Sequence, residues 1–495
     1  MPPQDLPDDV WIGIDLGTSG VRVLAVTADG TVVGSGRQPL DSSRDGCRHE
    51  QDPEQWWQAT VAACRSAVDT VPEGAVRGMA VAATSGTVLL IDQDGRPLTP
   101  ALMYDDTRAG HLVSRVNEIG GNVWEELGYR RMQPAWALPK LLWLLAEHAE
   151  VAATAALAHQ NDFINRRLVG ERVATDLSSA LKTGAHLIDA AWPSSVLDDL
   201  AVPASTLPDL VLPGSQLGSV SPDAAEATGI PAGTAVVAGM TDGCAAQLGA
   251  GAVAVGSWNS TLGTTLVIKG VSAQLLRDPH GVVYSHRAPG GGWLPGGASS
   301  TGAGALTREF GGRDLADLDR QALGKGPPAL IAYPLVSTGE RFPFVEPGAR
   351  GFVLGEPSGQ EELYSALLHG VAYVERLCFD YLDLLGADLT GDLYLTGGAA
   401  KSLPWCQLRA DVLARPVKLP ENAEPAIGMA VLAAAQERPL AEISAEMLRV
   451  GETIEPTSGT RGRHDEAYLH LVQELEDRGW LPPPVASHAR ERTPR

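Results

Sequence analysis

The sequence predicts an α/β protein made of two related domains, and two observations lead to this prediction. The chain has 495 residues, which is too long for one ordinary hydrophobic core. A strand–turn–strand motif with a Gly-Thr turn occurs twice, once around Gly17 and again around Gly263. The recurrence indicates that each half of the chain is built on a similar hairpin.

The two Gly-Thr turns are typical of phosphate-binding loops. Glycine lets the backbone turn tightly and approach a ligand closely, while backbone N–H and hydroxyl donors suit phosphate oxygens. The first turn, residues 17–19, reads Gly-Thr-Ser, and the second, residues 263–265, reads Gly-Thr-Thr. Two such hairpins facing each other would hold a polyphosphate from both sides. This layout indicates an ATP-using enzyme.

The first half is expected to open with a β-meander, because three apolar runs follow one another and Asp29-Gly30 marks a tight turn. A stripe of apolar residues at helical spacing follows, with Trp57 and Val61 among its members. The elements expected are strands over Val10–Leu16, Val21–Thr27, Thr31–Ser35 and Gly78–Ala83, a hairpin starting with Thr87–Asp92, and helices over Glu54–Thr70 and Lys140–Ala149.

The second half repeats the strand–turn pattern. A short strand over Ala235–Ala238 leads into a helix over Cys244–Gly249, and we place the domain boundary between residues 247 and 248. The longest helix is expected over Leu363–Leu385, where apolar residues are spaced to face a core. A strand over Leu393–Thr396 then enters a glycine turn. The expected domains are residues 1–247 and 248–480, and residues 481–495 are expected to be disordered.

The composition of the chain limits the kinds of molecule that the protein is expected to bind. The net charge of −22 argues against nucleic acid and anionic membranes, because phosphate backbones require a basic surface. No apolar run reaches the roughly 18 residues of a membrane helix. The five cysteines are odd in number and scattered, which favours a reducing compartment over a disulfide framework. We therefore expect a cytoplasmic protein.

Two aspartates are candidates for the chemistry. Asp15 ends a buried strand, where an unpaired carboxylate is costly. A Mg²⁺ ion with its waters would satisfy Asp15, and ATP needs that ion during phosphoryl transfer. Asp242 follows a strand, and its plain interpretation is a helix N-cap. Beside two phosphate loops, a general base for a substrate hydroxyl is favoured, and Asp242 is also a possible second metal ligand.

These motifs resemble the FGGY carbohydrate kinases of the actin/hexokinase/Hsp70-like superfamily over nearly the whole chain. Residues 15–22 resemble the family's first phosphate motif, residues 263–265 the second, and residues 395–402 its adenosine motif. Lys140-Leu141-x-Trp143-Leu144 resembles part of a family signature. The resemblance implies two ribonuclease-H-like (actin-like ATPase) domains with mixed sheets flanking a catalytic cleft, with ATP and Mg²⁺ as cofactors.

The resemblance also implies which residues bind the nucleotide and carry out catalysis. Asp242 falls where the family has its catalytic aspartate. In the adenosine motif, Ala399 replaces the usual third glycine. The implied cofactor-binding residues are Asp15, Gly17, Thr18, Ser19, Arg22, Gly263, Thr264, Thr265, Gly302, Gly397, Gly398, Ala399 and Ser402.

The sugar side departs from the xylulose kinases, which typically have Gly-Gln-x-His where this chain has Thr-Ser-Gly-Thr at residues 84–87. The implied substrate-binding residues are Thr84, Ser85, Gly86, Tyr104, Asp106, Arg108 and Asp242. Together with residues 284–287, 296–299 and 339–343, these variants are most similar to the D-ribulose kinase branch.

We therefore expect phosphorylation of the terminal hydroxyl of a pentulose, D-ribulose first, to give D-ribulose 5-phosphate. The alternatives are D-xylulose or another polyol of the same family, and, in a different class, a non-catalytic protein that binds ATP or sugar. Retention of both Asp15 and Asp242 argues against the non-catalytic alternative. A homodimer is left open.

Overall fold

The computed structural model describes residues 9–72, 74–322, 326–436, 438–459 and 461–493. The chain divides into two compact units. Unit 1 comprises the chain up to Val253 together with His286–Leu294 and Asn422–Arg449. Unit 2 comprises Ala254–Ser285, Pro295–Glu421 and Val450–Arg495. Each unit is built on its own mixed sheet, as the sequence predicts.

The sheet of unit 1 begins with the expected meander. Strand β1 (Val10–Leu16) pairs antiparallel with β2 (Gly20–Thr27), which pairs antiparallel with β3 (Val32–Pro39). On its other side, β1 pairs parallel with β6 (Val76–Ala83), and β6 pairs parallel with β13 (Ala235–Val237). Strand β12 (Gln216–Ser219) completes the six-stranded order β12-β13-β6-β1-β2-β3.

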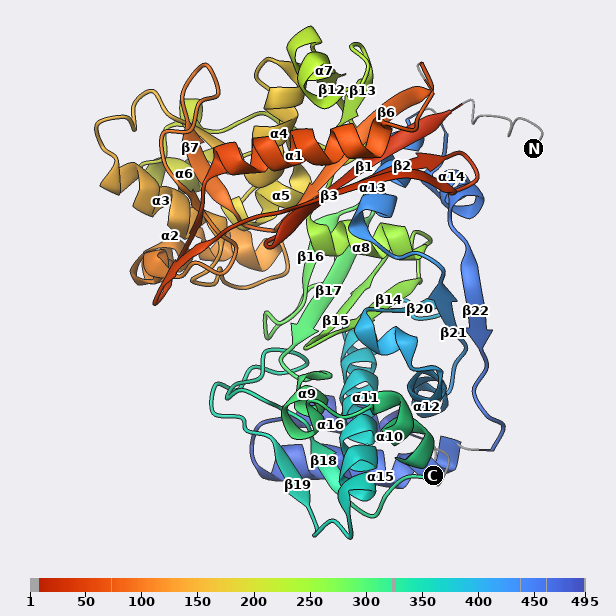
Figure 1. Ribbon diagram of the computed structural model, residues 1–495. Coiled ribbons are helices and arrows are strands. Elements are labelled where there is room, and N and C mark those ends of the chain that lie inside the picture. Colours follow the sequence, from red (N-terminus) through yellow and green to blue (C-terminus); the bar gives the residue numbers. More distant parts are fainter. Residues whose placement is uncertain (1–8, 73, 323–325, 437, 460, 494–495) are drawn as a thin grey trace, which may run out of the picture. The chain divides into compact units, whose positions relative to one another are not determined.

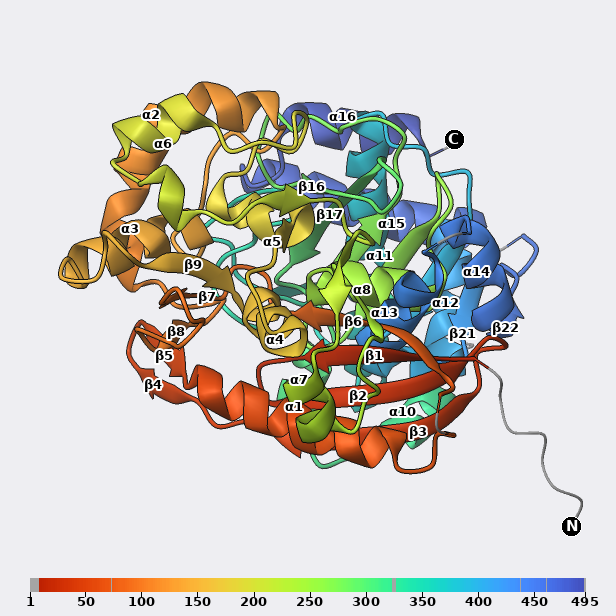
Figure 2. The ribbon, with the colours of Figure 1, turned by 90° about the horizontal axis from the view of Figure 1, so that it is seen from above.

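Two helices cover opposite faces of this sheet (Figure 1). In β2, Val23 and Ala25 belong to the core beneath α1 (Pro53–Val68), whereas Leu24 and Val26 pack with α13 (Pro425–Ala434). This division follows from the alternation of side chains along a strand. A second sheet, of order β4-β5-β8-β7-β9, lies next to the start of α1 (Figure 2).

The remaining elements of unit 1 connect these layers. The strands are β4 (Ser43–Asp45), β5 (Arg48–Gln51), β7 (Val88–Ile91), β8 (Ala101–Leu102), β9 (Ala156–His159), β10 (Thr175–Asp176) and β11 (Leu210–Val211). The helices are α2 (Val113–Glu126), α3 (Ala137–Glu147), α4 (Gln160–Val169), α5 (Leu177–Ala180), α6 (Ser194–Asp199), α7 (Pro222–Thr228), α8 (Asp242–Ala250) and α14 (Leu440–Met447). Three short 3-10 turns are η1 (Arg108–Leu112), η2 (Leu181–Thr183) and η3 (Ala204–Thr206).

Unit 2 repeats the local topology of unit 1. Strand β14 (Trp258–Leu262) pairs antiparallel with β15 (Leu266–Gly270) and parallel with β20 (Leu393–Thr396). The full order is β16-β17-β15-β14-β20-β21-β22. The other strands of this sheet are β16 (Tyr284–Arg287) and β17 (Trp293–Ser299), each of which has residues in both units, β21 (Val417–Pro420) and β22 (Val450–Ile454). Strands β18 (Ile331–Tyr333) and β19 (Phe352–Leu354) form a separate pair.

The core of unit 2 forms around α11 (Gln360–Leu384), which is buried from Tyr364 to Leu382. A helix buried on all sides belongs to the interior of a large core, and the expected helix over 363–385 is confirmed. The other helices of the unit are α9 (Gly304–Phe310), α10 (Leu315–Ala322), η4 (Gly398–Lys401), α12 (Leu403–Leu413), α15 (Arg461–Asp477) and α16 (Pro483–Glu491). Within the described ranges, no helix combines the length and apolar character needed to cross a membrane.

The division of the chain differs from the two expected blocks. A boundary at 247/248 would cut through α8, which lies wholly in unit 1. Residues 422–449 also return to unit 1, because α13 packs directly on β1. A Cβ added to Gly13 would lie only 1.7 Å from the carbonyl oxygen of Ala426, so glycine permits this close contact.

The expectation of a disordered tail is wrong for the described residues after 480. Pro483 is the first residue of α16, a position that proline favours because its missing N–H has no helical partner there. Val485, Ala486 and Ala489 of this helix are buried in the core of unit 2. Arg492 pairs with Asp380 of α11 at 2.9 Å. Residues 494 and 495 lie outside the described residues.

Candidate active site

Three loops of unit 1 meet because three parallel strands end at one edge of the sheet. The neighbouring strands β13, β6 and β1 run parallel. Their carboxyl ends lead to Asp242, to the loop 84–87 and to Asp15, respectively. An isolated parallel bridge between Ala83 and Thr241 extends this pairing beyond the strands. Ligands of open α/β sheets bind at such carboxyl ends.

The first Gly-Thr turn connects β1 and β2. The N–H of Gly17 donates to the carbonyl of Gly20 (3.0 Å), and the N–H of Leu40 donates to the carbonyl of Ser19 (3.1 Å). A Cβ on Gly20 would lie 2.6 Å from the carbonyl oxygen of Gln38, so a larger residue would push the turn away from β3. The turn is therefore fixed by its own backbone, and Thr18 and Ser19 remain accessible on it.

Asp15 lies at the end of β1, opposite Arg22 in the register. The pKa of Asp15 is raised to about 7, first by burial and then by the nearby carboxylates of Asp242 and Glu424, while Arg22 acts in the opposite direction. Arg22 in turn pairs with Glu424 (Nε–Oε2, 2.6 Å). The structure thus brings Asp15 and Asp242 close enough to repel each other, with Arg22 nearby.

Asp242 is the first residue of α8, and Thr241 is the N-cap. The plain interpretation of Asp242 as the N-cap itself therefore does not hold. Its Oδ1 accepts from the N–H of Gly243 (2.7 Å). An acidic side chain in the first turn is also favoured by the helix dipole.

The loop at residues 84–87 is fixed by hydrogen bonds with the side chains of Gln160 and Lys182. The N–H and the hydroxyl of Thr84 both donate to Oε1 of Gln160, at 3.0 and 2.6 Å. The carbonyl of Ser85 accepts from Nζ of Lys182 (3.1 Å). Gly86 has a φ of +91°, which favours glycine. The hydroxyl of Ser85 is buried and has no hydrogen-bond partner among the described residues.

The residues around 104–108 divide into two kinds. Tyr104 is 40% exposed. Its pKa is raised mainly by burial, next by the charge of Asp105 and also by the charge of Asp242, so the phenol lies within electrostatic range of Asp242. Asp106 is fully buried and accepts from the N–H of His49 (2.7 Å) and from Nη2 of Arg108 (2.7 Å). Arg108 also pairs with Glu50 (2.6 Å). The side chains of Asp106 and Arg108 thus fix the segment 104–108 through bonds to each other and to residues 49 and 50.

Lys140 links loop 84–87 to the segment that precedes Tyr104. Its buried Nζ donates to the carbonyls of Gly86 (2.9 Å) and Met103 (2.6 Å). Burial and the charge of Lys182 lower the pKa of Lys140 to about 7. The sequence identifies Lys140 only as part of a signature. Its role as a bridge between two loops depends on contacts that no local pattern reveals.

The second Gly-Thr turn, in unit 2, is held by the chain that follows β17. The N–H of Ala303 donates to the carbonyl of Gly263 (2.9 Å), and that of Gly304 to the carbonyl of Thr264 (3.1 Å). A Cβ on Gly302 would lie 2.5 Å from the carbonyl oxygen of Thr264. Gly302 therefore packs against the turn. The structure also places Thr265 in the turn, where its carbonyl accepts from the N–H of Gly263 (3.0 Å).

The glycine turn after β20 lies beside the second Gly-Thr hairpin. Thr396 and Thr261 share a hydroxyl–hydroxyl bond of 2.8 Å. Gly397 has a φ of +85°, and a Cβ there would lie 2.6 Å from the carbonyl oxygen of Leu262. A Cβ on Gly398 would meet no described atom within 4 Å, so this residue faces open space.

Two further residues of the predicted adenosine motif, Ala399 and Ser402, have structural roles. Ala399 is buried, and Ser402 is the N-cap of α12, accepting from the N–H of Trp405 (3.2 Å). The predicted nucleotide residues thus lie in both units: Asp15 to Arg22 in unit 1, and the two glycine turns of β14 and β20 in unit 2.

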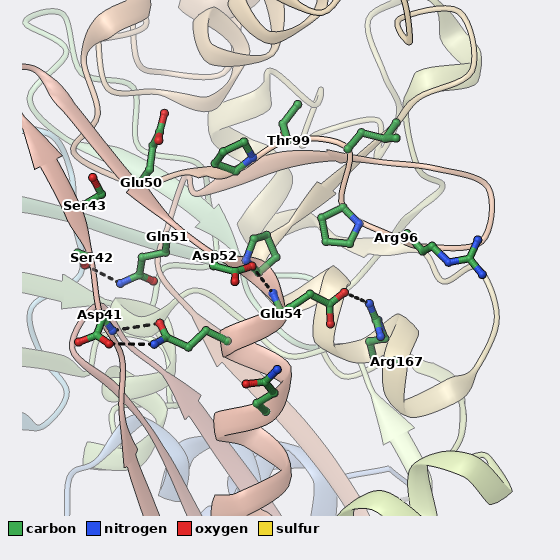
Figure 3. Close-up of a pocket in the computed structure, with 16 residues that line it drawn as sticks. Asp41, Ser42, Ser43, Glu50, Gln51, Asp52, Glu54, Arg96, Thr99 and Arg167 are labelled. Carbon is green, nitrogen blue, oxygen red and sulfur yellow. Dashed lines mark hydrogen bonds and ion pairs between the residues drawn. The ribbon is translucent and has the colours of Figure 1, made fainter.

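Sequence reasoning missed Gln51, which bonds to the first Gly-Thr turn and lines a pocket of about 1080 Å³ (Figure 3). Nε2 of Gln51 donates to the carbonyl of Thr18 (2.7 Å) and to the hydroxyl of Ser42 (2.8 Å). Its Oε1 accepts from the indole of Trp56 (2.7 Å). The side chain is buried, so its amide is fixed in one orientation.

The carboxylates of Asp15 and Asp242 are suited to bind Mg²⁺ together with the phosphates of a nucleotide. Among the described residues, no group of three or more His, Cys, Asp or Glu side chains could hold a metal. Mg²⁺ is commonly bound through one or two carboxylates plus substrate phosphates. Asp15 and Asp242 provide two such carboxylates, and the raised pKa of Asp15 shows that a nearby cation would be favourable.

Models of one protein family match both halves of the chain. Residues 10–249 match the N-terminal domain of the FGGY family of carbohydrate kinases, and residues 258–437 match its C-terminal domain. The xylulose kinase of Escherichia coli is 31% identical over 461 residues, covering 88% of this chain and 92% of that protein.

Solved structures are similar over almost the full length. A xyloylose kinase from Brucella ovis superposes with a TM-score of 0.88 at 26% identity, covering 95% of this chain and 99% of the other. The xylulose kinase of Rhodospirillum rubrum has a TM-score of 0.83 at 28% identity, covering 94% and 99%. The chain therefore belongs to the FGGY family of carbohydrate kinases, and it is an ATP-dependent sugar phosphotransferase.

Proposed function

We propose that the protein transfers the γ-phosphoryl group of ATP to the terminal hydroxyl of a pentulose, with Asp242 as the general base. The observation that supports this most is the meeting of Asp15, loop 84–87 and Asp242 at the carboxyl ends of three adjacent parallel strands. A carboxylate, an ATP-side loop and a sugar-side loop are the parts that phosphoryl transfer to a hydroxyl requires.

Each residue then has a role in the transfer. The hydroxyl of the sugar attacks the γ-phosphorus while Asp242 accepts its proton, and ADP leaves. Thr18, Ser19 and Thr264 bind phosphoryl oxygens. Asp15, with Asp242 beside it, would hold Mg²⁺, which when bound neutralises the charge of the phosphates.

The sugar is proposed to bind at loop 84–87. The buried hydroxyl of Ser85 has no protein partner among the described residues, and a buried polar group without a partner is costly. A sugar hydroxyl would satisfy it. Tyr104 is exposed near Asp242 and can contact the same ligand. Asp106 and Arg108 bond to each other and to other protein groups, so we assign them to loop support rather than to direct contact.

D-Xylulose is the first substrate to test, because relatives that this chain matches over most of its length are named xylulose kinases. D-Ribulose, which the sequence favours, is the second candidate. The observation for it is the Thr-Ser-Gly-Thr segment at residues 84–87, in place of the Gly-Gln-x-His typical of xylulose kinases.

The test is ADP release by the purified protein with Mg-ATP and D-xylulose, D-ribulose, L-ribulose, glycerol or gluconate. We expect turnover with a pentulose, and this turnover should be lost when Asp242 is replaced by Asn. Turnover only with glycerol or gluconate would reject the pentulose assignment. Absence of turnover across the panel, with ATP still bound in a calorimetric titration, would favour the non-catalytic alternative.

A further inference from the structure

The turn that presents Asp242 is fixed by a side chain from a distant part of unit 1. The backbone N–H of Thr241 donates to Oγ of Ser178 at 3.0 Å, although the two residues are 63 positions apart. Thr241 is 2% exposed. A buried N–H that lacks a partner costs free energy, so this bond helps to decide where the turn can lie.

The hydroxyl of Ser178 is itself oriented. It donates to Oδ1 of Asp176 at 2.5 Å. A serine hydroxyl has one proton and two lone pairs. Because the proton is directed to Asp176, a lone pair faces the N–H of Thr241. Asp176 therefore determines the direction in which Ser178 can accept.

Asp176 is in turn held on several sides. Its Oδ1 accepts from the N–H groups of Ser178 (2.8 Å) and Ser179 (3.0 Å), and its Oδ2 accepts from Nδ2 of Asn161 (2.8 Å). Asn161, Asp176 and Ser178 are all at most 1% exposed. A buried network in which each member is satisfied is rigid.

Capping of α5 explains only part of this arrangement. An aspartate N-cap accepts from the first N–H groups of its helix, and Asp176 does so. Capping does not require the Ser178 hydroxyl to reach Thr241. The second bond joins α5 to the residue immediately before Asp242, and an N-cap alone would not need it.

We propose that Ser178, oriented by Asp176, is a positioning residue that holds the Thr241–Asp242 turn so that the Asp242 carboxylate is aimed at the substrate hydroxyl. This inference rests on the proposed function, because it assigns Asp242 the role of base. Neither Ser178 nor Asp176 contacts the reacting atoms in this account. Their effect is transmitted through the backbone of Thr241.

The test is Ser178→Ala, measured by steady-state kinetics with the pentulose that the panel identifies. A displacement of about 1 Å can lower turnover by up to about 100-fold, and we expect kcat to fall at least tenfold with KM for sugar and ATP within twofold. Ser178→Thr, which keeps the hydroxyl, should retain most of kcat. Ser178→Cys serves as a second, near-isosteric variant if the alanine protein does not fold.

Ser179→Ala is the matched control. Ser179 lies on the same short helix, but its hydroxyl donates to Oδ1 of Asn161 (3.3 Å), and among the residues that the structure describes no bond joins its side chain to Thr241. We expect its kcat to stay within twofold of the wild type. A tenfold loss in Ser179→Ala equal to that in Ser178→Ala would overturn the proposal, because the effect would then belong to the helix as a whole.

The double variant Ser178→Ala/Asp242→Asn separates this proposal from the proposed function. If Ser178 acts only through Asp242, removing it in the Asp242→Asn background lowers kcat no further. A full additional loss in that background, or a wild-type kcat in Ser178→Ala and Ser178→Cys, would overturn the positioning role. Near-normal turnover of Asp242→Asn alone would instead reject the proposed function.

Discussion

The carboxylate of Asp242 lies close enough to Asp15 to raise the pKa of Asp15, although 227 positions separate the two residues in the sequence. They meet because β1 and β13 flank β6 in one parallel array. In the absence of a cation, two carboxylates near each other repel, and this repulsion lowers the stability of the folded protein.

Asp15→Asn should stabilise the Mg²⁺-free and nucleotide-free protein at alkaline pH. The pKa of Asp15 is raised from 3.8 to about 7 in the folded state. The stabilisation that comes from protonating Asp15 is therefore fully present below pH 3.8, and it is lost as the pH rises through about 7. We expect Asn to raise the unfolding temperature by at least about 2 °C at pH 8, with a smaller gain at pH 5.

The opposite behaviour is expected of Asp29, whose pKa is lowered by hydrogen bonds from Thr27 and Thr31. Asp29→Asn should not stabilise the protein at pH 8. Thermal unfolding of both variants and the wild type between pH 5 and 8 measures the difference. A pH-independent effect of Asp15→Asn would contradict the proposed repulsion.

Gln51→Glu should weaken ATP use. A carboxylate cannot donate to the carbonyl of Thr18, so the first phosphate loop would lose its support and face a negative charge. A buried group left unsatisfied costs about 1–3 kcal/mol, and we expect kcat/KM for ATP to fall at least fivefold.

Gln55→Glu is the control for Gln51→Glu. Gln55 lines the same pocket, but it is more exposed and its amide bonds to Asp41. Its kcat/KM for ATP should remain within twofold of the wild type. Equal losses in the two variants would assign the effect to charge in the pocket rather than to the bond with Thr18.

Lys140→Met should loosen both substrate loops. Methionine fills a similar volume but leaves the carbonyls of Gly86 and Met103 without their donor, at about 1–3 kcal/mol for each buried group. We expect lower stability in urea unfolding and a raised KM for the sugar. Lys182→Met removes a single bond from a partly exposed residue, and its effect on stability should be smaller. A larger effect of Lys182→Met would contradict the bridging role of Lys140.

Gly13→Ala should destabilise unit 1 strongly, because its Cβ would lie 1.7 Å from the carbonyl oxygen of Ala426. Gly121→Ala in α2 introduces the same methyl group where no described atom lies within 4 Å of it, and alanine favours a helix by about 1 kcal/mol. Circular dichroism melts should therefore move in opposite directions. A wild-type melt for Gly13→Ala would show that α13 can move away from β1.

The sequence predicts the repeated local structure well, because the meander, the Gly-Thr turns and the long helix α11 each follow from a local pattern. It does not predict the return of residues 422–449 to unit 1, which places Glu424 next to Arg22. The packing of α13 on Gly13 is a tertiary contact, and strand periodicity does not indicate which helix covers a face. Disorder after residue 480 is also a wrong expectation, because Pro483 begins α16 and the apolar side chains of this helix are buried.

The candidate site shows the same division. Asp15, Asp242 and the three glycine turns are visible as motifs at strand ends. Gln51, Gln160 and Ser178 are not, because each supports a loop through a hydrogen bond to a residue far away in the sequence. The sequence predicts that Asp106 and Arg108 bind the substrate, and it does not indicate that their side chains bond to each other.

The measurement that tests the central claim most directly is the turnover of Asp242→Asn with Mg-ATP and the preferred pentulose. Loss of a general base typically costs 10²–10⁴ in rate, and we predict a fall of at least about 100-fold with ATP affinity and unfolding temperature close to those of the wild type. Turnover within tenfold of the wild type, in a protein that folds and binds ATP normally, would contradict the assignment of Asp242 as the base.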